Sequence, residues 1–402
     1  MTDPRPYRIL MLHNRYQVRG GEEESTDAEV ALLREHGHTV DLLELDNKGI
    51  ETIADKVRAA LATTWSRKGA AMVAERLASS TYDIVHCQNL FPSFSPAVYH
   101  AAARHKVPVV QAVRNYRLIC ASANLFRDGH YCNDCVGKSV PLPALSHRCY
   151  RGSLAGTAAL VAMQSVHRGI GTWSGKVARY VALTEYVRDR LVEGGFPASR
   201  IVVKPDFVGT IGGDEQSEPE LPVKGPYAVF VGRMTPEKGA AWLARTWAAE
   251  NFDLPLVFVG EGDALDGIAQ GEGPGIHAIG KRSLAQTYRI IAGAEVLIQS
   301  ALWPEPFGRT PVEAYALGVP VVCARSGGLQ ELVRDGVTGF TYHPGDAASF
   351  AAAVRATLAP ERRAELRAGT RKEYLEKFTP DVNLRFLMDI YRDAITNAPA
   401  GH

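Results

Sequence analysis

The fold of this 402-residue chain is decided by one stretch, Ser300-Ala-Leu-Trp-Pro-Glu305-Pro-Phe-Gly-Arg-Thr310-Pro-Val-Glu313-Ala-Tyr-Ala-Leu-Gly318. A short apolar run of strand type stands on each side of it, so the stretch must be a loop followed by a helix. Thr310 suits the N-cap, Pro311 the first helical position and Gly318 the C-terminal stop. The pattern therefore predicts strand, loop, helix and strand in succession.

Two carboxylates are held at a fixed separation by this stretch. Glu305 lies in the loop beyond the carboxyl end of a strand, and Glu313 lies in the first helical turn, where unpaired N–H groups and the helix dipole favour anions. Together with bare amides they can hold a polyol and a phosphate. The alternative is that Thr310-x-x-Glu313 is only a capping box, but that reading leaves Glu305 unexplained.

The same stretch resembles the Glu-x7-Glu motif of retaining glycosyltransferases of the GT4 family, whose fold is GT-B. The resemblance implies that the first glutamate and the Phe-Gly amides hold the donor sugar and that the second glutamate binds the nucleotide ribose. Carried over by position, the donor-binding residues here are Glu305, Phe307, Gly308, Arg309, Thr310 and Glu313.

Composition indicates globular domains. The chain is 46% hydrophobic and 8% aromatic, which is enough for two cores. A formal net charge of +1 gives no electrostatic case for nucleic acid. No apolar run approaches the ~20 residues of a spanning helix, and residues 1–6 lack the apolar core of a signal peptide. We expect a cytoplasmic protein, peripheral at most at the inner membrane face.

Strand-like runs alternate with helical patterns, which predicts parallel, doubly wound α/β sheets. The resemblance implies the GT-B arrangement, two Rossmann-like domains with the active site in a cleft between them. We expect an acceptor-side domain over 1–208 with a cysteine-rich insertion at 114–152, a Gly/Pro-rich linker at 209–226, a nucleotide-sugar-binding domain over 227–379, and a C-terminal helix, 380–402, that returns to the first domain.

A second motif, Gly232-Arg-Met-Thr-Pro-Glu-Lys-Gly239, also joins a strand end to a helix start, with Thr235 as N-cap. Arg233 and Lys238 are either solvated surface cations or an anion clamp. Their spacing matches the family's Gly-Arg-x3-Glu-Lys-Gly, in which both cations hold the donor diphosphate and neutralise charge on the leaving group. The chain has no Asp-x-Asp pair, which fits a site without a catalytic metal. Arg233, Lys238 and Glu305 are the predicted catalytic residues.

Two further donor contacts are predicted with less support from the residues. Gly20-Gly21 follows the first strand and forms either a phosphate-binding turn, as the resemblance implies, or a plain tight turn. The acidic run Glu22-Glu23-Glu24 is interpreted as a solvated cap on the next helix. Arg282 follows a strand at the place where the resemblance puts contacts to the nucleobase.

The acceptor side is predicted at Arg114 and Asn115, in a segment where related proteins carry His-Asn/Asp-Tyr. Arg114 replaces the histidine and cannot act as a base at neutral pH, although it can bind a phosphate or a sugar hydroxyl. His86, at the end of an earlier strand, is a second candidate, and a structural role explains it equally well.

Four of the six cysteines fall within thirty residues as Cys120, Cys132, Cys135 and Cys149. Thiolates two residues apart in a loop chelate a tetrahedral ion well, so structural zinc is predicted. A labile disulfide, an iron–sulfur cluster and free thiols are the alternatives.

The near-zero net charge of the whole chain hides a basic segment. Residues 136–184 contain no Asp or Glu. This segment is either a core helix with a few solvated cations or a surface that approaches an anionic acceptor, such as a lipid-linked phosphate at a membrane.

The resulting hypothesis is a retaining, hexosyltransferase-like enzyme of polysaccharide biosynthesis. It would use a UDP- or GDP-sugar donor and a glycan, lipid-linked or small-molecule acceptor, and the leaving phosphate would take the acceptor's proton. A nucleotide-sugar epimerase of the same architecture and a silent sugar-nucleotide-binding protein are the alternatives.

Overall fold

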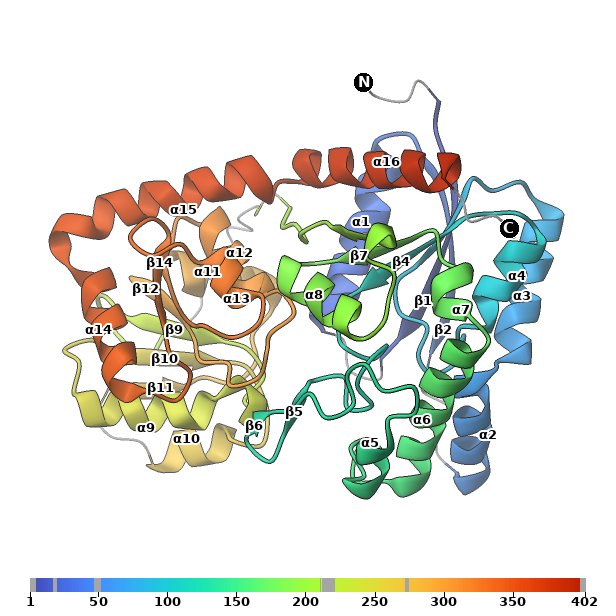
Figure 1. The fold of residues 1–402 in the computed structure, drawn as a ribbon. Helices are drawn as coiled ribbons and strands as arrows, with labels where there is room; N and C mark the ends of the chain where they lie inside the picture. Colours follow the sequence, from blue (N-terminus) through green and yellow to red (C-terminus); the bar gives the residue numbers. More distant parts are fainter. Residues whose placement is uncertain are drawn as a thin grey trace. The chain divides into compact units, whose positions relative to one another are not determined.

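The computed structural model describes residues 5–16, 20–46, 52–209, 211, 221–271 and 275–397. The chain divides into two compact units, each with its own parallel sheet (Figure 1). Unit 1 contains Met1–Leu125, Cys132–Pro205 and Asn383–His402, and unit 2 contains Phe126–Tyr131 and Asp206–Val382. Most of the predicted linker, 209–226, lies outside the described residues, and the predicted domain limits and cleft stay predictions.

The sheet of unit 1 has six parallel strands in the order β2-β1-β3-β4-β7-β8. The strands are β1 (Arg8–Arg15), β2 (Thr39–Asp46), β3 (Ile84–Cys87), β4 (Val109–Val113), β7 (Arg179–Ala182) and β8 (Ile201–Val203). β1 pairs with β2 on one side and β3 on the other, so the strand order reverses there. Such a switch point is where open α/β sheets bind ligands, beyond the carboxyl ends of the strands.

Helices cover both faces of this sheet. They are α1 (Gly21–Glu35), α2 (Ile53–Thr64), α3 (Arg67–Ser79), α4 (Ala97–Arg104), α5 (Leu142–Ser146), α6 (Leu154–Gly169), α7 (Thr172–Gly175) and α8 (Glu185–Glu193), with the short 3-10 helix η1 (Ala198–Arg200). Successive residues of β1 enter opposite cores: Leu10 packs with α3, α4 and α6, and Ile9 packs with α1 and α16. The inner strands β3 and β4 are buried on both faces, which is why they read as nearly continuous apolar runs, whereas the edge strand β2 is partly exposed.

The last helix, α16 (Pro380–Thr396), belongs to unit 1 from Asn383 onward. Leu387, Tyr391 and Ala394 are spaced along one helical face and are buried with the strand residue Ile9 in one core cluster. Arg179 of β7 also forms an ion pair with Asp393. The helix is thus fixed to the sheet of unit 1 by an apolar stripe and by polar contacts.

Unit 2 repeats the plan with the strand order β11-β10-β9-β12-β13-β14. The strands are β9 (Ala228–Val231), β10 (Leu256–Val259), β11 (Ile276–Ala278), β12 (Val296–Gln299), β13 (Val321–Ala324) and β14 (Gly339–Tyr342). The helices are η2 (Pro236–Lys238), α9 (Ala240–Glu250), α10 (Leu265–Gly271), α11 (Leu284–Ala292), α12 (Arg309–Ala316), α13 (Leu329–Leu332), α14 (Ala347–Leu358), η3 (Pro360–Arg362) and α15 (Arg363–Lys377). Every pairing within this six-stranded sheet is parallel, as in the sheet of unit 1, so the predicted doubly wound α/β class is confirmed in both units.

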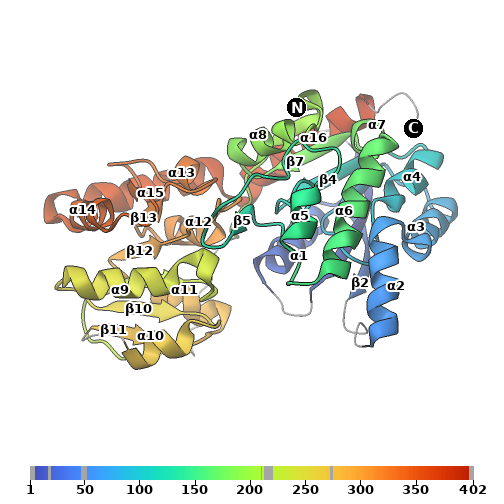
Figure 2. The same ribbon diagram turned by 60° about the horizontal axis from the view of Figure 1, so that its bottom comes forward.

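The predicted cysteine-rich insertion contains the only antiparallel pairing among the described residues. β5 (Phe126–Arg127) and β6 (His130–Tyr131) form a two-stranded hairpin. Elsewhere in unit 1, Figures 1 and 2 both show α6 between α2 and α5, and α6 packs against each of them.

Candidate functional site

The loop between β12 and α12 carries the sequence stretch that decided the fold. Helix α12 begins at Arg309, and its N-cap is Gly308 with φ 106° and no side-chain cap. The predicted N-cap at Thr310 is therefore wrong, because a left-handed glycine turns the chain into the helix two residues earlier. A Cβ at Gly308 would lie 2.5 Å from the Leu329 side chain, so the close approach also requires glycine. Gly318, with φ 71°, follows the end of the helix as predicted.

Glu305 and Lys238 meet at this edge of the sheet. Lys238 Nζ donates to Glu305 Oε2 at 2.5 Å, and Trp303 Nε1 donates to the same oxygen at 3.0 Å. The Lys238 ammonium also lies 5.2 Å from the centre of the Trp303 ring. Lys238 follows β9 and Glu305 follows β12, and these strands are neighbours in the sheet. The structure thus brings together residues from the two sequence motifs.

Backbone contacts hold these two loops against each other. Ser300 Oγ donates to Lys238 O at 3.0 Å, and Leu302 N donates to Glu237 O at 2.9 Å. Gly239 has φ 70°, and a Cβ there would lie 2.1 Å from Ser300 O. The loop after β9 can therefore lie directly on the exit of β12 only because Gly239 has no side chain.

A turn after β13 fixes the backbone of Glu305. Gly328 N donates to Glu305 O at 2.6 Å, and the Ser326 hydroxyl donates to Trp303 O. Gly327 has φ 61°, and a Cβ there would lie 2.4 Å from Glu305 O. The carboxylate consequently projects from a backbone that three neighbouring segments hold in place.

Glu313 is buried in the first turn of α12. Arg309 Nε donates to Glu313 Oε1 at 3.0 Å, and Arg309 Nη1 donates to Phe207 O at 3.4 Å. Burial, the largest effect, acts to lower the pKa of Arg309, but Glu313, Asp206 and Tyr288 together more than offset it, and the pKa is raised. The capping box centred on Thr310 is not formed, because Gly308 is the N-cap.

Two further predicted donor residues of unit 2, Arg233 and Arg282, follow β9 and β11, which are separated in the sheet by β10. Arg233 follows β9, is 66% exposed, and places Nη2 3.5 Å from Glu237 Oε1. Arg282 follows β11, is half-buried, and donates to Lys281 O at 3.1 Å. Thr235 precedes the 3-10 helix η2 without a side-chain cap, and its buried hydroxyl has no partner among the described residues. A helix therefore starts directly after Thr235, as predicted, but it is a short 3-10 helix, and the α-helix α9 begins only at Ala240.

In unit 1 a pocket of about 60 Å³ opens at the carboxyl ends of β3 and β4. Arg114 and Asn115 line it, as does the neighbouring Arg117. His86 does not, because its ring is 1% exposed and lies 2.6 Å from the Tyr391 hydroxyl of α16. Burial lowers the pKa of His86 to about 4. The structure thus places Arg114 and Asn115 together and His86 in the interior.

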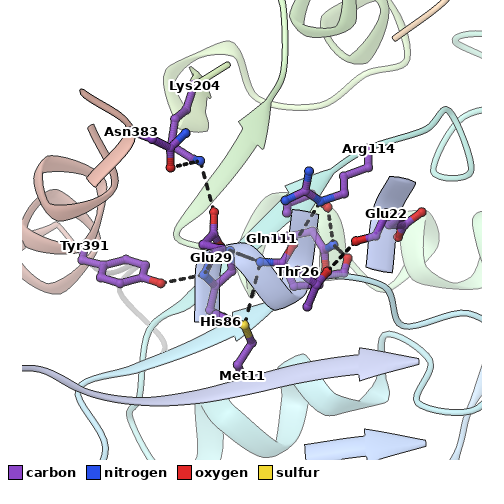
Figure 3. A network of polar contacts seen from close by, with 12 residues as sticks. Met11, Glu22, Thr26, Glu29, His86, Gln111, Arg114, Lys204, Asn383 and Tyr391 are labelled. Carbon is purple, nitrogen blue, oxygen red and sulfur yellow. Dashed lines mark hydrogen bonds and ion pairs between the residues drawn. The ribbon is translucent and has the colours of Figure 1, made fainter. Parts of the chain in front are cut away.

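A buried chain of polar contacts ends at Arg114 (Figure 3). Arg114 Nε donates to Gln88 Oε1 at 3.1 Å, and Gln88 Nε2 donates to Glu29 Oε1 at 2.6 Å. Glu29 accepts a hydrogen bond from Lys204 Nζ at 3.1 Å, and Lys204 also donates to Asn383 Oδ1 of α16 at 3.0 Å. This series of hydrogen bonds holds the Arg114 side chain in one orientation.

At the Gly20-Gly21 turn, the Gly20 amide is already bonded to a side chain of the helix that follows it. Gly20 N and Tyr16 N both donate to the Glu23 carboxylate, at 3.0 and 2.9 Å, which makes Glu23 a capping residue. Glu23 is buried, and Glu22 lines the pocket of unit 1. The interpretation of these two acids as a solvated cap is therefore wrong.

Sequence reasoning missed two groups in this region. Burial raises the pKa of Glu22 to about 7, and the Tyr16 hydroxyl donates to it at 3.2 Å. His13, near the end of β1, is fully buried, and neither ring nitrogen has a hydrogen-bond partner among the residues that the structure describes. Burial lowers the pKa of His13 to about 4. A polar residue near the end of the first strand was the available signal for His13.

The four clustered cysteines form no disulfide. Among the described residues, no three His, Cys, Asp or Glu side chains are placed to hold a metal ion. The pKa of Cys135 is raised to about 11, mainly by burial, and nearby Cys120, Cys149 and Cys132 contribute to this rise. The thiols are therefore gathered in one place, and the zinc site stays a prediction. Cys87 and Cys323 are buried, as expected for free cysteines in strands.

The basic segment is partly core and partly surface. One face of α6 is buried, as the core-helix alternative predicted, and Arg168 donates to Gly194 O at 2.6 Å. Lys138, Arg148 and Arg151 are exposed. The same segments expose apolar side chains, at 47% for Val140, 59% for Leu142 and 53% for Leu154. We call these six residues the α5 surface. No helix in the described parts of the chain is long and apolar enough to cross a membrane.

Two family models match the chain and together span most of it. Residues 20–206 match the glycosyl transferase 4-like domain, and residues 213–373 match glycosyl transferases group 1. One curated relative, D-inositol 3-phosphate glycosyltransferase of Acidothermus cellulolyticus, is 32% identical over 195 residues, which are 44% of this chain and 42% of the relative. The chain thus spans less than half the length of the curated relatives it matches.

Solved structures agree over nearly the whole chain. A glycosyltransferase from Rickettsia africae superposes with a TM-score of 0.69 at 20% identity, covering 98% of this chain and 100% of that one. The Anabaena protein HepE in complex with UDP and glucose superposes with a TM-score of 0.65 at 18% identity, covering 96% and 99%. At these identities the likeness shows the fold, which is GT-B.

Proposed function

We propose that the chain is a GT4-like glycosyltransferase that moves a sugar from a nucleotide-sugar donor to an acceptor hydroxyl with retention at the anomeric carbon. The two family models and the likeness to glycosyltransferases of GT-B fold support this proposal. The observation that carries the proposal is the contact between Lys238 and Glu305. It joins a cation suited to a diphosphate and a carboxylate suited to sugar hydroxyls at one sheet edge.

In this proposal each group has a separate task. Lys238, with Arg233 beside it, neutralises charge that builds on the leaving diphosphate, so no catalytic metal is needed. Glu305 accepts hydrogen bonds from the donor sugar, and the Phe307 and Gly308 amides support it. Glu313 receives the ribose, and Arg282 lies toward the base. Without donor, Lys238 and Glu305 form an ion pair with each other. When the donor binds, its diphosphate replaces Glu305 as the partner of Lys238.

The transfer step needs no protein nucleophile. The acceptor oxygen bonds to the anomeric carbon on the face from which the nucleoside diphosphate departs, the bond from that carbon to the phosphate oxygen breaks, and the acceptor's proton passes to the leaving phosphate. Positioning and charge stabilisation supply the rate enhancement. A UDP-sugar is the favoured donor because the Anabaena neighbour is in complex with UDP, and a GDP-sugar is the second candidate.

A panel of radiolabelled UDP- and GDP-sugars tests the proposal. Transfer, or slow release of free sugar without acceptor, supports a transferase. Formation of an epimer of the donor would establish the epimerase alternative, and binding without any turnover would establish the silent binding protein. Glu305→Gln is the matched variant, because it keeps the side chain's size and removes its charge.

For the acceptor, we propose a cytoplasmic enzyme that acts on a glycan or on a lipid-linked sugar at a membrane surface. The α5 surface supports this, since it combines three exposed cations with three exposed apolar side chains. Such a combination suits an anionic lipid interface.

The zinc prediction is also kept as a proposal. Three thiols raise the pKa of Cys135 beyond the effect of burial, which is unfavourable for thiolates unless a cation joins them. Zinc bound to Cys120, Cys132, Cys135 and Cys149 would tie the hairpin segment together as a structural site. Elemental analysis should give about one zinc per chain, and iron with visible absorbance would favour a cluster instead.

A further inference from the structure

The pocket of unit 1 has an unequal charge balance. Its lining contains two guanidinium groups, Arg114 and Arg117, and one carboxyl group, Glu22. The rest of the polar lining is uncharged, and it includes the side chains of Gln88, Asn89, Ser95, Gln111 and Asn115. Even with Glu22 ionised, the lining therefore carries a net positive charge.

Contacts with neighbouring residues hold both arginine side chains in place. Gln88 accepts from Arg114 Nε at 3.1 Å, and Gln88 is itself held by the buried Glu29 (Figure 3). The Arg117 guanidinium stacks on the Phe91 ring at 4.6 Å and donates from Nη1 to Ala121 O at 2.7 Å. Among the described residues, this bond to Ala121 O is the one hydrogen bond made by the five N–H donors of the Arg117 guanidinium. Rigid guanidinium groups of this kind recognise carboxylates and phosphates.

Size restricts what the pocket admits. A volume of about 60 Å³ is room for roughly four water-sized groups, because each needs about 10 to 15 Å³. A phosphate or carboxylate fits that space. The amide side chains around it can receive hydroxyl groups adjacent to the anion.

We propose that this pocket is the acceptor subsite and that it selects an acceptor sugar carrying an anionic group, a phosphate or a carboxylate, which Arg114 and Arg117 hold. The inference rests on the proposed transferase function and adds the chemical class of the acceptor. It also gives Arg114 a task in place of the histidine that it replaces.

Glu22 makes the binding sensitive to pH. The groups that face its carboxyl are Tyr16, Glu23, Arg114 and Arg117. Burial, the largest effect, raises the pKa of Glu22 to about 7 in spite of the two arginines. Below that value the neutral acid donates a hydrogen bond to an anion, and above it the carboxylate repels the anion. Affinity should therefore fall as the pH rises from 6 to 8, by up to about tenfold if only the protonated form binds.

The test measures sulfate binding to the full chain by calorimetry, with saturating UDP so that sulfate cannot occupy the diphosphate site. Sulfate keeps its charge between pH 6 and 8. Arg114→Gln and Arg117→Gln should each weaken sulfate by about tenfold, and Arg104→Gln, which removes an exposed cation outside the pocket, should not. Glu22→Gln should abolish the difference between pH 6 and 8.

A second arm separates the two sources of the anion. Glucose 6-phosphate and glucuronate are compared with neutral glucose, and the tighter of the two anionic sugars identifies the group. Sulfate affinity that is unchanged in both arginine variants, or glucose binding as well as both anionic sugars, would overturn the inference. Failure of UDP to bind would instead count against the donor function, and the difference between wild type and Arg114→Gln would still decide the pocket.

Discussion

Two lysine–glutamate pairs of this protein have the same chemistry and different surroundings. Lys204 and Glu29 in unit 1 are 3% and 1% exposed, and Asn383 and Gln88 satisfy their remaining polar atoms. In unit 2, Lys238 and Glu305 are 18% and 13% exposed at the edge of the sheet. The buried pair is closed to ligands, so we assign it to stability. The edge pair can exchange one partner for a substrate, so we assign it to function.

The largest expected effect is on the buried pair. Lys204→Met leaves the Glu29 carboxylate buried without its cation, which should lower the free energy of unfolding by about 3 to 5 kcal/mol. Urea unfolding of the full chain measures it, with Lys238→Met as the matched control that should change far less. If the two variants were equally destabilised, the distinction between the pairs would be lost.

Removing both members of the buried pair sharpens the point. Glu29→Leu with Lys204→Met eliminates the uncompensated charge, so the double variant should recover part of the stability lost in Lys204→Met. Since Glu29 also holds Gln88 and thereby Arg114, recovery of stability should not restore the orientation of Arg114.

At the edge pair, Glu305→Gln should abolish most transfer while leaving UDP affinity within about twofold, because the carboxylate contacts the sugar and not the diphosphate. Removal of one preorganised electrostatic contact typically lowers turnover by about 10² to 10³. Single-turnover assays and UDP calorimetry on the same preparation measure the two quantities. A parallel loss of both would move Glu305 into the nucleotide site.

Lys238→Ala should act on the other half of the donor. The lost charge-assisted contact should weaken UDP binding by about 1.5 to 3 kcal/mol, and uridine, which has no diphosphate, should bind equally to both proteins. Lys281→Ala removes an exposed lysine after β11, two strands from β9, and serves as the control. Unchanged UDP affinity in Lys238→Ala would sink the clamp assignment.

The two pairs also show what sequence reasoning reaches. Lys238 and Glu305 were both predicted, because each follows a strand within a short motif, and neighbouring parallel strands end at the same edge. The contact of Lys204 with Glu29 joins residues 175 positions apart, and that of Gln88 with Glu29 joins residues 59 apart. Local patterns do not specify such partners, which depend on how helices pack on the sheet.

Burial was the other quantity that local patterns could not supply. Glu22, Glu23 and Glu24 read alike in the sequence, yet Glu23 caps the helix and Glu22 lines a pocket. His86 ends a strand just as a catalytic histidine would, and a tyrosine of the last helix covers it. For Glu22 and His86, segments far along the chain decided the environment of the side chain, whereas Glu23 is held by the turn directly before its own helix.

The smallest expected effect concerns the basic segment 136–184, in which half-buried and exposed cations can be compared in the same way. Arg168 is half-buried against Gly194 O, whereas Lys138, Arg148 and Arg151 of the α5 surface are exposed. Each exposed cation should contribute about 1 kcal/mol to binding of vesicles that contain anionic lipid.

Changing Lys138, Arg148 and Arg151 to Gln should therefore weaken vesicle binding at least tenfold, and added salt should weaken wild-type binding in the same direction. The control changes Lys68, Arg104 and Lys106, which are exposed cations of unit 1 outside the α5 surface. Cosedimentation with vesicles measures the difference. One set of vesicles contains neutral lipid only, and the other contains about 30% anionic lipid, which gives a clear surface potential. Equal losses in the two triple variants would show that total charge governs binding, and then a soluble acceptor becomes the better interpretation.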